Sequence, residues 1–193
     1  MAFLYQKLLL PSLKHVDVQP KRSFFYWLTI VWNRVDPERI KEVGPDRACA
    51  EWLLRNGASV RWTGANKYLS DYNALPSGGK QTQYIQAVDA TDSSISHIGF
   101  PYFSGCKYLD EIKLINCVYI ENEALRRLIV LKDTLKHLEV VDCANITDEA
   151  LRSLKNLTNL EVLKLHGMPY VKDKATVENE LKKSLPNCQI EWK

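Results

Sequence analysis

The sequence lacks the motifs of a membrane-spanning protein and of the common enzyme classes. Its longest apolar run, from Phe24 to Trp32, has nine residues, whereas a transmembrane helix needs roughly 20. Five cysteines without a Cys-x-x-Cys pair argue against a disulfide framework and a structural zinc site, and favour a reducing compartment. Gly78-Gly79-Lys80 lacks the rest of a phosphate-binding loop, and the four histidines share no metal-ligand spacing. We therefore expect no catalytic residues.

Charge is weak overall and uneven along the chain. The net charge of +3 is too small to indicate a nucleic-acid partner, and we expect none. Residues 1–41 hold seven basic and three acidic side chains, a net charge of +4, so the other 152 residues sum to −1. A basic leader suits import or contact with an anionic membrane, and it equally suits a solvated tail. We predict a leader, or presequence, over residues 1–23.

Residues 24–62 predict a small helical amino-terminal domain. The apolar run 24–32 either packs on the rest of the chain as a cap, which we favour, or lies in a membrane interface, where Trp and Tyr are preferred. Asp36 and Pro37 are typical of a helix start. A second helix should begin near Pro45 and end at Asn56-Gly57. The alternating segment 59–62 predicts a strand beside the first repeat.

An internal repeat dominates the carboxy-terminal half. Five apolar positions recur in register at offsets of 26 and 25 residues, which matches the leucine-rich-repeat template of about 20–29 residues. The positions are Leu109, Ile112, Leu114, Cys117 and Ile120; Leu135, Leu138, Val140, Cys143 and Ile146; and Leu160, Leu163, Leu165, Met168 and Val171.

Each repeat predicts a short strand, a tight turn and a returning helix. The strand sends alternate residues inward, and Cys117 or Cys143 fills the space beneath the turn as a buried, unreactive thiol. Thr147 and Asp148 predict a helix start with a side-chain cap. A degenerate repeat is expected at 85–95, and a helix followed by an edge strand at 177–192. The prediction is an α/β fold, with about four repeats in a short leucine-rich-repeat solenoid over 63–192, because single repeats must stack to bury their apolar faces.

Three strings resemble one known family closely. They are residues 43–58 (VGPDRACAEWLLRNGA), 71–76 (DYNALP) and 85–93 (IQAVDATDS). They resemble mitochondrial coupling factor B, also called ATP synthase subunit s. The likeness runs from about Phe24 to Trp192 and keeps the repeat register.

The resemblance implies a helical domain that caps four leucine-rich repeats, on the matrix side of the mitochondrial inner membrane. It implies association with subunits of the proton-translocating ATP synthase and a role in energy coupling by limiting proton leak. It also implies a magnesium ion between the two domains, at positions that correspond to Gly57 and Thr91. Their oxygen ligands suit that hard cation. Peripheral contact with the inner membrane and self-association stay open.

One departure and two alternatives matter. Mammalian members of the family carry a Cys-x-Cys dithiol where this chain has Ile115 and Cys117, so a dithiol redox role does not transfer. A related branch acts in assembling the membrane arm of respiratory complex I, which is the alternative function. The cysteine-bearing repeats also resemble those of F-box adaptors, although residues 1–80 show no F-box pattern.

Overall fold

The computed structural model describes the backbone of residues 20–76 and 83–193, and the side chains from Trp27 onward within those ranges. The predicted leader over residues 1–23 lies outside the described residues, apart from the backbone of its last four. No helix in the described part is long and apolar enough to cross a membrane.

The described part of the chain is an α/β protein, which is the fold class that the repeat pattern predicted, and it is built on one six-stranded sheet. The strand order follows the sequence, and every neighbouring pair is parallel except β1 and β2, which are antiparallel. The strands are β1 (Ser59–Trp62), β2 (Ile85–Asp89), β3 (Glu111–Ile115), β4 (His137–Val141), β5 (Val162–His166) and β6 (Gln189–Trp192).

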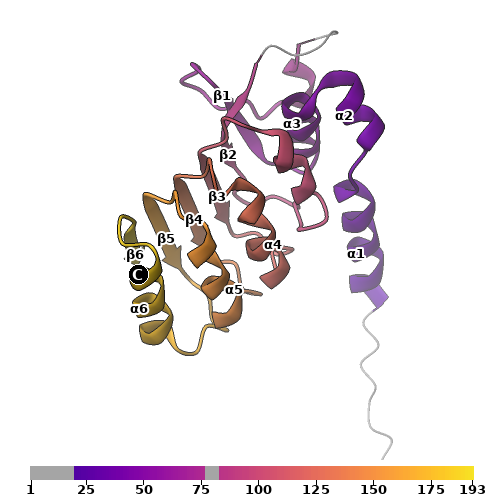
Figure 1. Ribbon diagram of the computed structural model, residues 1–193. Helices are drawn as coiled ribbons and strands as arrows, with labels where there is room; N and C mark the ends of the chain where they lie inside the picture. The colour runs from indigo at the N-terminus through magenta and orange to yellow at the C-terminus, as the bar shows by residue number, and fades with distance from the viewer. Residues whose placement is uncertain (1–19, 77–82) are drawn as a thin grey trace, which may run out of the picture.

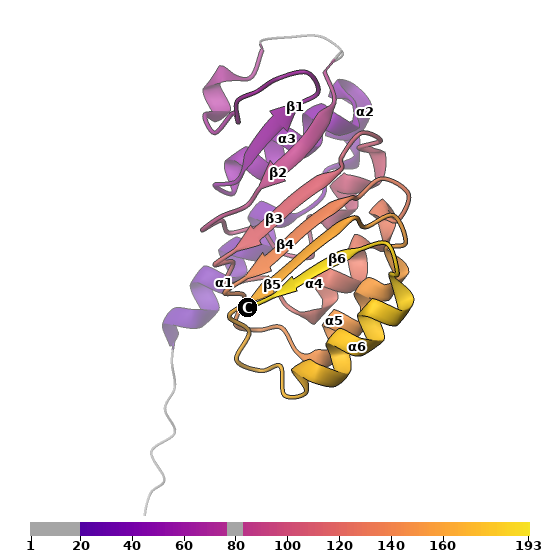
Figure 2. The same cartoon turned by 90° about the vertical axis from the view of Figure 1, so that its left-hand side faces the viewer.

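Helices pack on one face of this sheet. Figure 1 shows α4, α5 and α6 side by side along it, and Figure 2 turns the strands toward the viewer. The helices are α1 (Pro20–Asn33), α2 (Pro37–Val43), α3 (Pro45–Arg55), α4 (Asn122–Arg127), α5 (Asp148–Ser153) and α6 (Lys174–Ser184), with 3-10 turns η1 (Tyr72–Ala74), η2 (Phe100–Gly105), η3 (Leu128–Leu131) and η4 (Leu154–Asn156).

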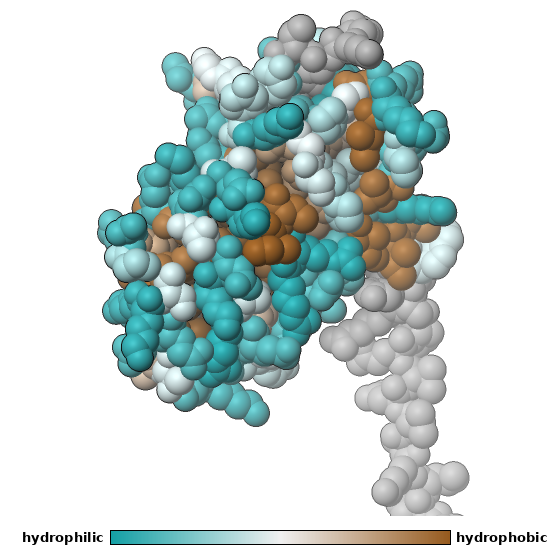
Figure 3. Space-filling view, in the orientation of Figure 1, coloured by the Kyte–Doolittle hydropathy of each residue, from teal (hydrophilic) through white to brown (hydrophobic). Residues whose placement is uncertain are grey.

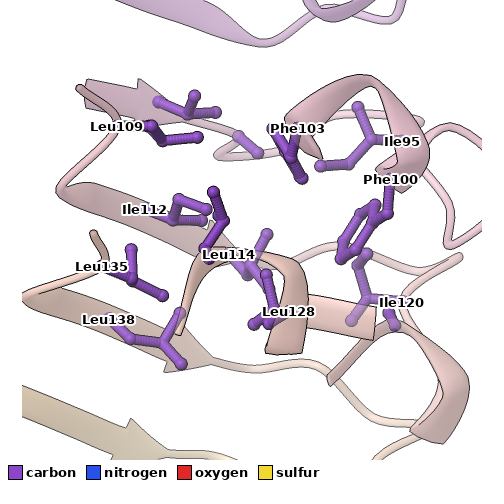
Figure 4. Packing of buried hydrophobic residues seen from close by; sticks show 14 of the residues in the cluster. Ile95, Phe100, Phe103, Leu109, Ile112, Leu114, Ile120, Leu128, Leu135 and Leu138 are labelled. Carbon is purple, nitrogen blue, oxygen red and sulfur yellow. The ribbon is translucent and has the colours of Figure 1, made fainter. Parts of the chain in front are cut away.

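The three sequence blocks lie in register across the sheet. Ile112 pairs with Leu138, and Leu138 with Leu163, so equivalent positions lie on neighbouring strands. Figure 4 shows Leu109 and Ile112 lying in a layer beside Leu135 and Leu138. Of the fifteen repeat positions, fourteen are buried and Val171 is half-buried against the core.

Helix starts follow the local rules at two of three predicted places. Asp36 caps α2, accepting a hydrogen bond from the backbone N–H of Arg39 at 3.0 Å, and α3 begins at Pro45. The helix at Thr147 forms, but the predicted side-chain cap is wrong. The Thr147 hydroxyl instead accepts from Nδ2 of Asn122 at 2.9 Å, at the start of α4, so a contact between neighbouring helices replaces local capping.

Candidate interaction surfaces and metal position

Asn33, the last residue of α1, is a fully buried polar hub. Its side-chain carbonyl accepts hydrogen bonds from the indole N–H of Trp52 (3.1 Å) and the backbone N–H of Ser96 (2.8 Å). Its amide donates to the carbonyls of Thr29 (2.9 Å) and Ser94 (3.0 Å). Because these buried groups satisfy one another, Asn33 fixes the end of α1 to α3 and to the loop after β2. Sequence reasoning missed it, since Trp52 and Ser96 lie 19 and 63 residues away.

The indole of Trp52 forms the apolar part of the same junction. It stacks on Tyr102 with ring centroids 5.5 Å apart and meets Phe103 edge-on at 5.4 Å. A Cβ on Gly99 would lie 2.2 Å from the indole, so only glycine allows the backbone to approach this closely. Asn56 closes the junction by donating to the carbonyl of Trp32 at 3.2 Å.

One side of α1 packs against α3 and the loop after β2, and an apolar side of the helix is exposed. Thr29 and Asn33, four residues apart, are buried, whereas Trp27, Ile30, Val31 and Trp32 are 56%, 38%, 47% and 51% exposed. Figure 3 shows hydrophobic surface over this part of the helix. Within the described side chains of the apolar run, Thr29 is buried, whereas the large apolar side chains of Trp27, Ile30, Val31 and Trp32 are exposed. Large exposed apolar side chains gathered on one element are typical of an interaction surface.

Glu51 holds α2 against α3 through a buried ion pair. Its carboxylate accepts from Nε and Nη2 of Arg39 (2.9 and 2.7 Å) and from Nε of Arg47 (2.8 Å). Burial alone would raise the pKa of Glu51, but the hydrogen bonds from both arginines outweigh it and lower the pKa below 4.5. These hydrogen bonds tie α2 to α3.

The two positions implied for magnesium lie on segments that touch. The backbone N–H of Ser94 donates to the carbonyl of Asn56 at 2.9 Å, and a Cβ on Gly57 would be 4.0 Å from Cα of Ser93. The hydroxyl of Thr91 is exposed and donates to Asp89 at 2.6 Å. The possible ligand atoms here are oxygens, and they lie beside the Asp89 carboxylate. Oxygen ligands are the kind that magnesium prefers. No group of three or more His, Cys, Asp or Glu that could hold a metal occurs among the described side chains. A cation here would depend on main-chain oxygens and water.

A turn ladder follows the strands β2 to β5. Asp92, Asn116, Asp142 and Gly167 occupy equivalent positions with φ of 57°, 52°, 52° and 64°. Asn116 donates through Nδ2 to Asp92 at 2.6 Å, and a Cβ on Gly167 would meet the carboxylate of Asp142. Asp and Asn tolerate this left-handed conformation, so these polar residues serve the turn.

The cysteines beneath the turns are buried. The thiol of Cys117 donates to the carbonyl of Ala90 at 2.9 Å, and that of Cys143 to the carbonyl of Leu114 at 3.4 Å. The hydrogen bond with Cys143 and burial raise the pKa of the Cys117 thiol well above its usual range. A protonated, buried thiol is a poor nucleophile, so Cys117 agrees with a packing role.

The sheet face turned away from the helices carries several charged side chains. Arg61 pairs with Glu111 at 3.0 Å, and Lys113 lies 3.5 Å from the same carboxylate. The ring of Tyr68 lies between the cations, 5.7 Å from Arg61 and 5.9 Å from Lys113. A shallow groove of about 440 Å³ continues from here across β3 to β6.

Comparison with known proteins gives one consistent result. No protein-family model matches the chain. It is 45%, 43% and 44% identical to the proteins named "ATP synthase subunit s, mitochondrial" of Rattus norvegicus, Homo sapiens and Bos taurus. Each match covers 172 residues, which is 88% of this chain and 86% of the relative.

Proposed function

We propose, from the premise that this chain belongs to the mitochondrial ATP synthase subunit s (coupling factor B) family, that it is a non-catalytic accessory protein of ATP synthase. The chain belongs to that family because the likeness covers nearly its whole length at more than 40% identity. This identity carries the proposal, and two surfaces, the outer side of α1 and the exposed sheet face, suit it to binding.

The finer architecture we propose is a short leucine-rich-repeat solenoid capped by the amino-terminal helices. The in-register pairing of Ile112, Leu138 and Leu163, the shared turn conformation and the 26- and 25-residue offsets support it. A stacked array of this kind holds a rigid surface without any catalytic group.

We place the protein on the matrix side of the mitochondrial inner membrane, where it would limit proton leak beside ATP synthase. The segment 20–34 contains three basic and no acidic residues, together with five aromatic ones. An anionic lipid surface complements that charge, and the interface favours Trp and exposed aliphatic side chains. We therefore propose that the outer side of α1 rests on the membrane.

The magnesium site stays a proposal as well. Gly57 and Thr91 would supply oxygen ligands, with Asp89 beside them to balance charge. An ion there would join the end of α3 to the loop after β2, the same junction that Asn33 fixes.

Affinity purification of the tagged full chain from mitochondria tests the proposed function. Recovery of ATP synthase subunits, in preference to other inner-membrane complexes, is expected. Recovery of complex I assembly intermediates without ATP synthase would overturn it and favour the assembly-factor alternative. A cytosolic location with ubiquitin-ligase partners would instead favour an F-box-type adaptor.

A further inference from the structure

Four charged side chains form a row across the exposed sheet face. In the register of the parallel strands, Lys113 lies opposite Glu139, Glu139 opposite Lys164, and Lys164 opposite Glu191. Lys113, Glu139 and Lys164 alternate with buried strand positions, and Glu191 lies between Ile190 and Trp192, which pack partly on the core, so all four point away from the helices. We call Lys113, Glu139, Lys164 and Glu191 the charge ladder; it crosses the uncovered strands β3 to β6 that Figure 2 turns to the viewer.

The ladder alternates in sign, yet its members do not pair with one another in the part of the chain that is described. Lys113 lies 3.5 Å from Glu111 instead, and Glu191 accepts from its neighbour Gln189 at 2.8 Å. Elsewhere, opposite charges in neighbouring repeats do bridge directly. Arg126 meets Glu149 at 2.6 Å on the helix face, and Arg61 meets Glu111 at 3.0 Å on the sheet face, so the missing bridges are particular to the ladder positions.

The groove around the ladder is about 440 Å³ and is lined by its four members together with Glu111, Ile112, His137, Leu138 and Val162. Ile115 and Val141, paired with each other and half-buried, flank the ladder on the side toward the turns. A partner must therefore offer a charged row and an apolar edge beside it.

We propose that the ladder binds an α-helix of a partner protein, lying across the strands, with acidic, basic, acidic and basic side chains one turn apart. Strands are about 4.8 Å apart and a helix rises about 5.4 Å per turn, so one turn falls on each strand. Over the three steps from β3 to β6, the helix turns and the strands become offset by about 2 Å. The long side chains of lysine and glutamate can span that distance. The ladder has no net charge, so it selects a partner by the order of its charges and not by attraction of one sign.

This inference deepens the proposed function, since it names the chemistry of the segment that docks on the repeat surface. The test uses two labelled helical peptides of identical composition. One carries Glu, Lys, Glu, Lys at positions one turn apart, and the other Glu, Glu, Lys, Lys. We expect the full chain to bind the alternating peptide about tenfold more tightly, as measured by fluorescence anisotropy at low salt.

The double substitution Glu139→Lys with Lys164→Glu keeps the net charge and turns the ladder into two cations followed by two anions. It should reverse the preference toward the second peptide. The matched control, Arg152→Glu with Glu180→Arg, swaps an ion pair on the helix face and should leave the preference unchanged. Equal binding of both peptides to the wild-type chain would overturn the ladder, even if ATP synthase subunits are still recovered by affinity purification.

Discussion

Asn33 illustrates how one polar side chain can position a whole functional element. Replacing it with alanine would leave the indole N–H of Trp52 and the backbone N–H of Ser96 buried without acceptors. Each such loss costs about 1–3 kcal/mol, so Asn33→Ala should lower the free energy of unfolding by about 2–6 kcal/mol in urea titrations. Asn145→Ala, which removes an exposed bond to Val118, is the control and should cost less than about 1 kcal/mol. Equal losses in the free energy of unfolding for the two variants would contradict the role given to Asn33.

The magnesium proposal also belongs to the residue scale. Millimolar Mg²⁺ should raise the melting temperature of the wild-type chain, because an ion bound only to the folded state stabilises it. Thr91→Val, which keeps the side-chain shape but removes the hydroxyl, should reduce that shift, whereas Thr134→Val should not. If Mg²⁺ does not change the melting temperature of the wild-type chain, the proposed magnesium site is wrong.

At the scale of elements, the contact between α2 and α3 should depend on pH through Glu51. The pKa of Glu51 is lowered in the folded chain, so its ion pair stabilises fully above the unfolded value of 4.5 and is lost as pH falls below it. Glu51→Gln should cost about 2 kcal/mol at pH 7. That is less than for a fully buried pair, because the Arg39 side chain is 37% exposed.

The cost of Glu51→Gln should therefore shrink as the pH falls from 5 toward 3. Glu42→Gln, at the exposed partner of the same arginine, serves as the control and should change stability little at any pH. A cost at Glu51 that is constant from pH 7 to pH 3 would show that the carboxylate charge is not what stabilises the pair.

α1 gives a second test at this scale. Val31 on α1 and Val130 on η3 are 47% and 45% exposed, so they form a matched pair. Val31→Glu should lower cosedimentation with vesicles of phosphatidylcholine and one-fifth phosphatidylglycerol at least fivefold, because a carboxylate enters an apolar side that faces anionic lipid. Val130→Glu should have little effect. If both variants bind like the wild-type chain, α1 is not the lipid contact.

Across the whole molecule, the sequence predicted what depends on local periodicity. The α/β class and the buried positions such as Leu138 follow from a strand's two-residue alternation, repeated at a fixed interval. Asn33 could not be predicted, because its role depends on partners from three separated segments. The sequence predicts a local cap at Thr147, but its hydroxyl accepts a hydrogen bond from Asn122 at the start of α4.

The charge ladder could be predicted from the sequence only in part. Lys113, Glu139 and Lys164 each follow the first inward residue of a strand, so the repeat alignment already contains their order. The register and the absence of mutual ion pairs in the described chain required the structure. Glu191 also required it, because β6 lies outside the three aligned blocks.

The central claim is that the protein supports coupling at ATP synthase, and respiring mitochondria depleted of it test this most directly. The ratio of ATP made to oxygen consumed should fall, with proton leak through ATP synthase raised and complex I content unchanged. Re-expression of the wild-type chain should restore the ratio. An unchanged ratio accompanied by loss of assembled complex I would contradict the account.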